Sequence, residues 1–476
     1  MILKRFYNEK LAQASYLVGC PRCGESIVID PNRDIAQYLD SAKAEGVKVT
    51  AVTETHIHAD YLSGSRELAA ASGATLYLSD EGDSDWKYEF SNEENVKLVK
   101  DGDEIRAGSV RLNVVRTPGH TPEHISFVLV DEATLDEPLG SFTGDFIFVG
   151  DVGRPDLLER AAGVSGTMEL GAKSMFQSLK QFQSRYEGQL ILWPGHGAGS
   201  ACGKSLSGVP VTTLGYEAKA NWAFKATQEQ AFVESILMGQ PDPPAYFKHM
   251  KRMNKSGPAI LGAFKTPSHE QDAALLRWLD AGEVIVDIRS VSEVAHGAIP
   301  GAYHIPLGKS FPNWAGWLLP FDRPIHLLAN SAEQAAEAVY DLAMIGLDDV
   351  RGWVGTSAIR FYEESRGHAY VTSQISIQDA AKVGHLPHTM VLDVRAKSEY
   401  DHGHIPGSTN IPLGHLEEQI ASVPTNQLII VHCAGGMRSM IAQSILRKHG
   451  AKQIRNMPGG FMEYAESGLP IEIASA

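Results

Sequence analysis

Short apolar runs of strand length alternate with polar, glycine-rich turns over about the first 200 residues. Helical stretches such as SGSRELAAASG lie between some of them, which predicts a mixed α/β region with polar residues at the strand ends. The pattern becomes helical up to residue 250, and the Gly- and Pro-punctuated stretch 251–267 predicts a linker. The strand-like runs are SYLVG, SIVID, KVTAVTET, RLNVVRTPGH, ISFVLVD and QLILWPGHG.

The rest of the chain contains an internal repeat. VIVDIRSVSEVAHGAIPGAYHIPLG is echoed by MVLDVRAKSEYDHGHIPGSTNIPLG at a constant offset of 106 residues, as from 287 to 393. Each copy reads strand, helix, turn, strand, helix, which predicts two small parallel α/β domains over residues 268–370 and 371–476. The matched positions are Asp287 with Asp393, Pro300 with Pro406 and Pro306 with Pro412.

Composition and charge narrow the function classes. The chain has 476 residues, 43% of them apolar, and a net charge of −15. That length predicts about three domains of roughly 150 residues each, and the acidic balance argues against a nucleic-acid binder or docking on an anionic membrane. We expect neither a signal peptide nor a transmembrane helix, because the chain lacks a run of about 18 apolar residues. Four cysteines do not make a disulfide framework, so a reducing cytoplasm is expected.

Four segments of the first region supply metal-ligand residue types: THIHADY, TPGHTPEH, FTGDFIFVGDVGRPD and WPGHG. Each lies at a turn after a strand-like run, where a rigid sheet can aim side chains at one point. A single histidine in such a place is more often a surface or capping residue, but four segments in order favour a metal site. The candidates are His56, His58, Asp60, His120, Asp145 and His196.

The order and spacing of these segments resemble the metallo-β-lactamase superfamily over about residues 1–245, which implies an αββα sandwich within a domain over residues 1–250. In its dinuclear hydrolases a motif of HxHxDH type serves both metals, and here its last histidine is replaced by Tyr61. A neutral phenol, whose reference pKa is about 10, is a poor metal ligand. The substitution therefore argues against a second metal.

The secure ligands are His56, His120 and Asp145, the two-imidazole, one-carboxylate set of non-haem Fe(II) oxygenases. The resemblance to the superfamily's persulfide dioxygenases implies one Fe(II) per chain at these positions, although the ligand set alone also suits zinc. Arg154 could pair with an anionic substrate or with a buried carboxylate, and the resemblance slightly favours the substrate. The remaining residues are expected to orient ligands, hold water or line the substrate site: His58, Asp60, Tyr61, His196 and Cys202.

A thiol loop stands near the C-terminus. IIVHCAGGMRSMIAQSILRKHG runs from an apolar strand through Cys433 into a glycine-rich turn and a helix. A loop of this kind aims backbone N–H groups at its centre, where they stabilise a thiolate or a persulfide anion. A buried structural cysteine is the alternative. The loop comprises Cys433, Ala434, Gly435, Gly436, Met437 and Arg438.

This loop resembles the active loop of rhodanese sulfurtransferases, and DVRAKSEYDHGHIPGSTNIP resembles their other signature. The resemblance implies that Cys433, with Arg438, is catalytic. Related phosphatases use a loop one residue longer, so phosphatase activity is the weaker alternative. At the constant offset the first copy has Leu327 in place of Cys433 (433 − 106) and lacks the glycine pair and the arginine. Residues 268–370 are therefore expected to be a catalytically silent rhodanese-like domain.

Three further cysteines are ambiguous. Cys20 and Cys23 form GCPRCGE in an expected hairpin, where an inert turn is favoured over a redox pair or half a zinc knuckle. Cys202 follows WPGHG and could touch a sulfur substrate or fill a tight loop.

The resemblances together imply oxidation of a low-molecular-weight thiol persulfide with O2 to sulfite, followed by thiosulfate formation at Cys433. The fusion resembles those of bacterial sulfide detoxification, and a homo-oligomer is expected. One alternative is a dinuclear zinc thioester hydrolase similar to glyoxalase II, with an accessory sulfurtransferase. Another is a non-catalytic sulfur carrier, against which the intact ligand set counts.

Overall fold

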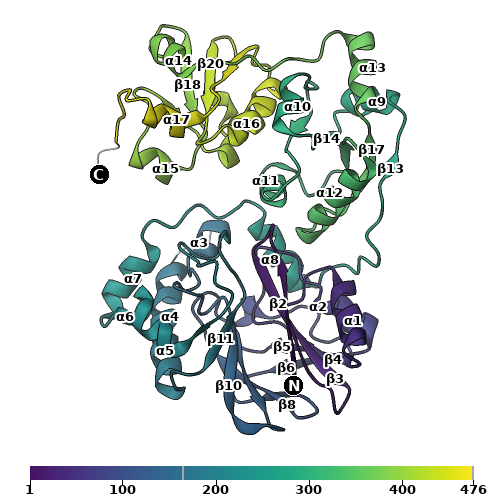
Figure 1. Ribbon diagram of the computed structural model, residues 1–476, viewed down its shortest axis with the longest axis vertical. Helices are drawn as coiled ribbons and strands as arrows, with labels where there is room; N and C mark the ends of the chain where they lie inside the picture. The colour runs from purple at the N-terminus through teal and green to yellow at the C-terminus, as the bar shows by residue number, and fades with distance from the viewer. Residues whose placement is uncertain (163–165, 474–476) are drawn as a thin grey trace. The chain divides into compact units, whose positions relative to one another are not determined.

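The computed structural model describes residues 1–162 and 166–473 and divides into two compact units (Figure 1). The first unit contains residues 1–263 and 343–346, and the second contains 264–342 and the chain from 347 onward. The predicted segment 371–476 ends outside the described residues. Helix α8 (Phe247–Ser256) makes the first part of the expected linker helical. Within the described ranges no helix is long and apolar enough to cross a membrane.

Two six-stranded sheets form the middle of the first unit. The first has the order β1-β2-β3-β4-β5-β6, and the second has the order β12-β11-β10-β9-β8-β7. The first sheet contains β1 (Ile2–Asn8), β2 (Gln13–Cys20), β3 (Glu25–Ile29), β4 (Lys48–Thr53), β5 (Thr75–Ser79) and β6 (Val96–Val99). The second contains β7 (Glu104–Ala107), β8 (Val110–Arg116), β9 (Ile125–Asp131), β10 (Leu135–Gly144), β11 (Ile191–Pro194) and β12 (Thr212–Thr213).

The main apolar core lies between these sheets. Tyr16 and Ile27 of the first sheet pack with Phe127 and Phe142 of the second, and all four are buried. Each such side chain contributes about 1.5–3 kcal/mol when it leaves water. Strands β2 and β9 are buried along their whole length, which explains why their sequences are apolar runs rather than alternating ones.

Helices cover the outer face of each sheet, and Figure 1 shows them on opposite sides of the strands. The long helix packs through residues spaced three or four apart, including Met175, Leu179 and Phe182. This α/β/β/α layering confirms the predicted sandwich. The helices on the first sheet are α1 (Ile35–Ala44) and α2 (Ser65–Ser72), and those on the second are α4 (Thr167–Arg185), α5 (Leu214–Ala220), α6 (Trp222–Lys225) and α7 (Glu229–Leu237). The short α3 (Leu157–Ala162) precedes α4.

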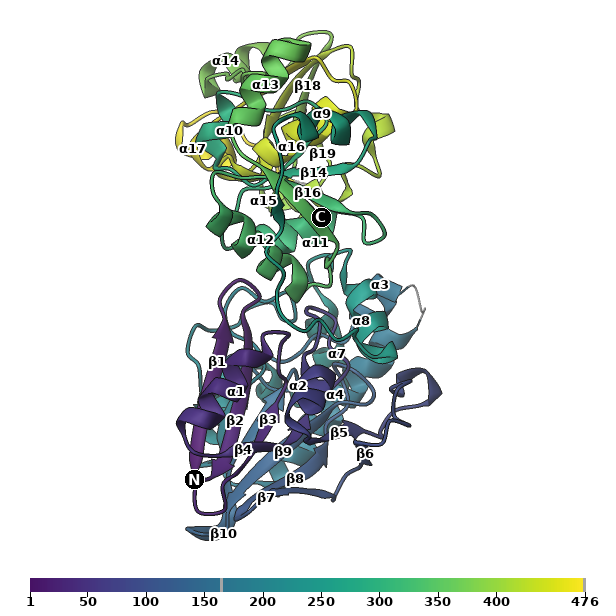
Figure 2. The same ribbon diagram turned by 90° about the vertical axis from the view of Figure 1, so that its right-hand side faces the viewer.

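The second unit contains two parallel sheets, as the repeat predicts (Figure 2). One has the order β13-β17-β16-β14-β15 and the other β19-β18-β20-β21. The first copy comprises β13 (Ser268–His269), α9 (Ala273–Asp280), β14 (Val284–Asp287), α10 (Val291–Ala295), β15 (Tyr303–His304), α11 (Phe311–Leu318), β16 (Ile325–Leu328), α12 (Ala332–Met344), β17 (Val350–Val354) and α13 (Ser357–Arg366). The second comprises α14 (Ile377–Val383), β18 (Thr389–Asp393), α15 (Lys397–His402), β19 (Thr409–Asn410), β20 (Leu428–His432), α16 (Met437–Lys448), β21 (Gln453–Asn456) and α17 (Gly460–Glu466).

The two copies share a buried ion pair at the end of their central strands. Arg289 contacts Asp287 at 2.6 Å, and Arg395 contacts Asp393 at 2.6 Å. Both pairs are bidentate, so they fix the turn after the strand in the same way. The repeat is therefore structural as well as sequential.

Strand register corrects one detail of the predicted alignment. Asp287 lies opposite Leu328, whereas Asp393 lies opposite His432. The first copy therefore has two more residues between these strands (328 − 287 against 432 − 393). Ala329, and not Leu327, stands where Cys433 stands in the second copy. The position still lacks a thiol.

Candidate metal centre and sulfur-transfer loop

The candidate ligands of the first unit all lie in loops that follow strands. A polar side chain in such a loop is held by the rigid sheet behind it. His56, His58 and Asp60 follow β4, His120 follows β8, Asp145 follows β10 directly, and His196 follows β11.

The structure brings His56, His120 and Asp145 together. Each offers one potential ligand atom, these atoms lie within 4.8 Å of one another, and all three residues are buried. Among the described residues, His56 Nε2 and both carboxylate oxygens of Asp145 have no hydrogen-bond partner. Buried polar atoms without partners are costly, and a cation among them would remove that cost. The donor set therefore fits a metal ion.

The protonation of these ligands also suits a metal. Burial lowers the pKa of His56, and the neighbouring histidines lower it further. Burial also lowers the pKa of His120, although Asp145 opposes the shift. Both imidazoles are therefore neutral near pH 7, which is the form that ligates.

Backbone and side-chain contacts aim the ligand atoms at the centre. His120 Nδ1 lies 2.9 Å from the carbonyl oxygen of Arg154, so a proton there leaves Nε2 free. The backbone N–H of Asp145 donates to His124 Nε2 at 3.1 Å. The loop after β10 passes so close that a Cβ on Gly153 would lie 1.8 Å from the Asp145 carbonyl oxygen. Only glycine fits at position 153, and the loop that contains it supplies both the Asp145 N–H and the Arg154 carbonyl oxygen.

His58 and Tyr61 lie beside this group without joining it. His58 Nε2 lies 3.1 Å from Asp30 Oδ1; burial opposes protonation, but the Asp30 carboxylate outweighs it and raises the pKa of His58 to about 9. The Tyr61 hydroxyl donates to the Asp30 carbonyl oxygen at 3.1 Å, and burial raises its pKa well above 10. Tyr61 is therefore a neutral phenol turned away from the ligands. No signal in the local sequence pointed to Asp30, which lies 28 residues before His58.

Arg154 takes the second of its two expected roles. Its guanidinium makes a bidentate pair with Asp156, with two nitrogen–oxygen distances of 2.7 Å, and it is fully buried. It also donates to the carbonyl oxygen of Pro241 at 2.7 Å. The preference for a substrate contact is thus corrected, because buried protein acceptors already hold the group.

Asp60, His196 and Cys202 form a second group of buried residues whose potential ligand atoms lie within 4.8 Å of one another. His196 Nε2 lies 3.3 Å from Asp60 Oδ2 and 3.3 Å from Asp145 Oδ1, so the two groups adjoin. Burial raises the pKa of the Cys202 thiol well above its ordinary value, and the charges of Asp145 and Asp60 raise it further. The sequence identified these residues separately, but their closeness depends on the fold.

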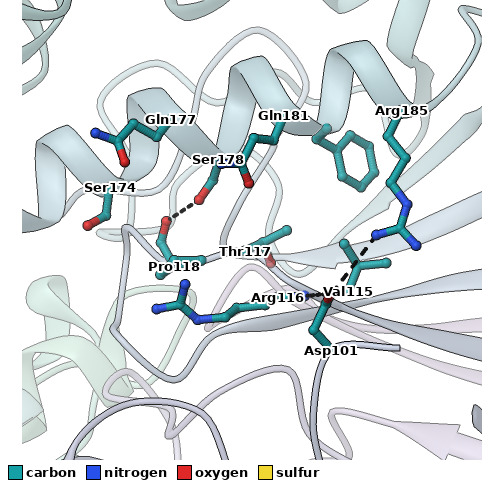
Figure 3. A pocket seen from close by; sticks show the side chains of 11 residues that line it. Asp101, Val115, Arg116, Thr117, Pro118, Ser174, Gln177, Ser178, Gln181 and Arg185 are labelled. Carbon is teal, nitrogen blue, oxygen red and sulfur yellow. Dashed lines mark hydrogen bonds and ion pairs between the residues drawn. The ribbon is translucent and has the colours of Figure 1, made fainter. Parts of the chain in front are cut away.

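A cavity of about 470 Å³ lies between the end of β8 and helix α4 (Figure 3). Ser174, Gln177, Gln181 and Arg185 line it from α4, and Arg116 lines it from the end of β8. None of the described residues that line it is a candidate ligand. A neighbouring cavity of about 230 Å³ shares Arg116, Pro118 and Ser174 with it and reaches His120.

In the second unit the thiol loop takes the expected form. Cys433 directly follows β20 and is buried, and α16 begins at Met437. The backbone N–H of Gly436 donates to Cys433 Sγ at 3.0 Å. Ser439 Oγ lies 3.8 Å from the same sulfur. The helix N-terminus and a backbone amide therefore face the sulfur.

Arg438 closes the loop through a partner that sequence reasoning missed. Its guanidinium contacts Glu399 of α15 at 2.5 and 2.8 Å. Burial raises the pKa of Glu399, but hydrogen bonding and charge from Arg438 outweigh it, so the carboxyl pKa is lowered. The ion pair ties the loop to the segment that carries the other rhodanese-type signature.

Cys20 and Cys23 lie in the turn between β2 and β3, as the hairpin prediction required. Cys20 is buried and its sulfur lies 3.3 Å from Ser109 Oγ, whereas Cys23 is exposed. The hydrogen bond to Ser109 lowers the pKa of Cys20 to about 6. Both thiols are free.

Comparisons with known proteins agree with this architecture. The model of the metallo-beta-lactamase superfamily matches residues 9–197, and that of the rhodanese-like domain matches residues 272–363 and 376–467. The crystal structure of a metallo-beta-lactamase from Staphylococcus aureus subsp. aureus COL is 39% identical, with a TM-score of 0.67 over 75% of this chain and 99% of that one. The chain belongs to the metallo-beta-lactamase superfamily.

Two further likenesses concern the first domain. The persulfide dioxygenase ETHE1 of Bos taurus is 26% identical over 200 residues, which are 41% of this chain and 68% of that protein. A hydroxyacylglutathione hydrolase of Rhodospirillum rubrum is 30% identical over 182 residues, which are 38% of this chain and 60% of that protein. The chain thus carries a metallo-beta-lactamase domain with persulfide dioxygenase homology and two C-terminal rhodanese-like domains, as the resemblances predicted.

Proposed function

We propose that the chain oxidises a low-molecular-weight thiol persulfide to sulfite with O2 at an Fe(II) site, and forms thiosulfate at Cys433. The observation that carries the proposal is the convergence of two neutral imidazoles and one carboxylate, with unpartnered ligand atoms, in a chain that also holds a rhodanese-type thiol loop. The likeness to a persulfide dioxygenase supports the choice of substrate.

His56, His120 and Asp145 would hold the iron. Two imidazoles and one carboxylate are the ligand set of non-haem Fe(II) oxygenases, which would leave the substrate and O2 room to bind. Bound there, Fe(II) would supply the capacity to activate O2 next to a sulfur ligand. The overall reaction is RSSH + O2 + H2O → RSH + SO3²⁻ + 2 H⁺.

The chain's own side chains prepare this site. The Arg154 carbonyl holds the proton on His120 Nδ1 and so keeps Nε2 available. The Asp30 carboxylate retains a proton on His58 beside the His56 ring, whose centroid is 4.2 Å away. Complete burial of the three ligands limits water around them.

The second stage takes place at Cys433. Its thiolate attacks the outer sulfur of another persulfide, RS⁻ leaves, and Cys433 becomes a persulfide. Sulfite then attacks the outer sulfur, which gives thiosulfate and restores the thiolate. The Gly436 N–H, 3.0 Å from Cys433 Sγ, stabilises the anion before and after transfer.

The test is O2 uptake with product analysis, using glutathione persulfide and coenzyme A persulfide, alongside metal content. We expect O2 consumption with one iron per chain, and sulfite plus thiosulfate as products. Cys433→Ser should abolish thiosulfate and leave sulfite formation, whereas Cys23→Ser, the exposed thiol in the β2–β3 turn, should change neither. An iron-loaded enzyme that consumes no O2 with either persulfide would refute the first stage.

The likeness to a hydroxyacylglutathione hydrolase supports one alternative function, that of a dinuclear zinc thioester hydrolase with an accessory sulfurtransferase. Two zinc ions per chain and hydrolysis of a glutathione thioester, without O2 uptake, would establish that function instead. A protein that catalyses neither reaction but carries persulfide on Cys433 would be a sulfur carrier.

A further inference from the structure

The turn between β2 and β3 holds two thiols close together. Cys20 ends β2, and the backbone N–H of Cys23 donates to the Cys20 carbonyl oxygen at 3.2 Å. This hydrogen bond closes a β-turn, in which the first and fourth Cα atoms lie less than about 7 Å apart. Disulfide-bonded cysteines have Cα atoms about 4.4–6.8 Å apart. The backbone therefore already brings the two residues near the separation that an intramolecular disulfide needs.

A second loop packs against both thiols. A Cβ on Gly108, in the turn between β7 and β8, would lie 2.4 Å from Cys23 Sγ and 3.0 Å from Cys20 Cβ. Gly108 also has φ of +56°, in the region that favours glycine. Both cysteine side chains therefore lie against the same point of this loop, and only glycine leaves room for them there.

The two thiols differ in exposure and in charge. Cys23 is exposed, whereas Cys20 is buried. Ser109 Oγ lies 3.3 Å from Cys20 Sγ, and hydrogen bonding from Ser109 is the main cause that lowers the pKa of Cys20 to about 6; Cys23 contributes a smaller part. The hydrogen bond to Cys20 raises the pKa of Cys23 in turn. Near pH 7 the pair is therefore a buried thiolate beside an exposed thiol.

Neither of the simpler roles accounts for this pair. Among the described residues, neither thiol belongs to a group of three or more potential metal ligands, whereas structural zinc takes four. The inert turn that the sequence favours would not require a thiolate held beside a second thiol. A thiolate of low pKa next to a partner cysteine is instead typical of thiols that are oxidised reversibly.

We infer that Cys20 and Cys23 form an oxidisable dithiol site, which low-molecular-weight disulfides convert to an intramolecular disulfide. The exposed Cys23 loses its proton and attacks one sulfur of the disulfide RSSR, whose S–S bond breaks as RS⁻ leaves. The Cys20 thiolate then attacks the Cys23 sulfur, the second RS⁻ leaves, and the Cys20–Cys23 bond forms. The protein dithiol loses two electrons and two protons, and RSSR is reduced to two RSH. The site lies outside the proposed reaction, because neither residue belongs to the ligand group or to the Cys433 loop.

The experiment treats the full-length protein with glutathione disulfide and digests it with trypsin in the absence of reductant. Arg22 lies between the two cysteines, so a Cys20–Cys23 bond joins the peptides 11–22 and 23–33, which are otherwise separate in the mass spectrum. We expect joined peptides in the parent protein and their separation after excess reduced glutathione. In Cys20→Ser, glutathione should stay on Cys23, because no second thiol displaces it.

Cys23→Ser is the matched variant, because it changes only the exposed side chain. It should give no joined peptides, and its buried Cys20 should take up glutathione roughly tenfold more slowly than Cys23 does in Cys20→Ser. If Cys20→Ser fails to fold, the comparison is made with loss of free Cys23 in the parent protein. Peptides that stay separate in the treated parent protein would overturn the proposal, and so would equally fast modification of Cys20 in Cys23→Ser. The outcome does not depend on the proposed reaction, because neither O2 uptake nor persulfide enters the measurement.

Discussion

Gly436 offers the sharpest test of the thiol loop, because two features of that loop depend on it. Its backbone has φ of +104°, in the region that side chains rarely adopt, and its N–H donates to Cys433 Sγ at 3.0 Å. Gly436→Ala cannot keep this backbone without strain. Relaxation of the strain rotates the peptide, which removes the N–H from the sulfur.

The size of the effect follows from these two contacts. An alanine in the left-handed region costs roughly 1–2 kcal/mol of stability. A hydrogen bond to a charged group contributes about 1.5–3 kcal/mol, and its loss from the sulfur anion corresponds to a roughly ten- to hundred-fold slower transfer. We therefore expect thiosulfate formation to fall by that factor while sulfite formation is unchanged.

Gly435→Ala is the matched control, because a Cβ there meets nothing within 4 Å and its φ is not positive. The assay is the initial rate of thiosulfate formation from glutathione persulfide and sulfite, with unfolding in urea measured in parallel. Equal rates for the two variants would refute the role assigned to the Gly436 N–H. A loss of stability in Gly436→Ala without a loss of rate would do the same.

Three further predictions concern other parts of the chain. Arg154→Met removes the bidentate partner of the buried Asp156 and leaves Arg160 beside it, at 3.0 Å, and should lower stability in urea by about 3 kcal/mol, whereas the partly exposed Arg160→Met should cost less than about 1 kcal/mol. The pKa of Cys20 is lowered to about 6, so its rate of alkylation by iodoacetamide, followed by peptide mass spectrometry, should fall roughly tenfold per pH unit below that value. A pH dependence of this rate with a midpoint near that of a free thiol, about 8.5, would contradict the effect of the hydrogen bond. Ala329→Cys should not acquire persulfide from thiosulfate, because its loop lacks the glycine pair; labelling at the level of Cys433 would show that the first copy is silent only for want of a thiol.

The strand-and-turn pattern was enough to predict most of the fold and the loops that carry the candidate ligands. The reason is local: β2 and β9 are buried on both faces and read as apolar runs, and the residue after such a run must lie at a strand end. His120 could be identified because it follows β8, which the pattern already defines, whereas Asp145 follows β10, which is not among the predicted strand-like runs, and was identified from its own segment.

The partners of these residues could not be predicted, because they are distant in the sequence. Asp30, which holds His58, lies in another loop, and Glu399, which holds Arg438, lies 39 residues earlier on a different helix. The alignment of the repeat failed for a related reason: two extra residues before β16 leave every motif intact but move Ala329 opposite the place of Cys433. Pairing register is a property of the sheet and not of the local pattern.

Tyr61 shows how far a motif can be interpreted without its surroundings. Its phenol replaces an imidazole of the dinuclear motif, and the structure turns its hydroxyl to the Asp30 carbonyl oxygen, so the residue itself binds no metal. Its replacement does not by itself show which other side chains surround the remaining residues of the motif. Cys202, 141 residues later in the chain (202 − 61), has its potential ligand atom within 4.8 Å of those of Asp60 and His196. The motif alone could therefore not show what surrounds Asp60 and His196, because the fold and not the local sequence brings Cys202 to them.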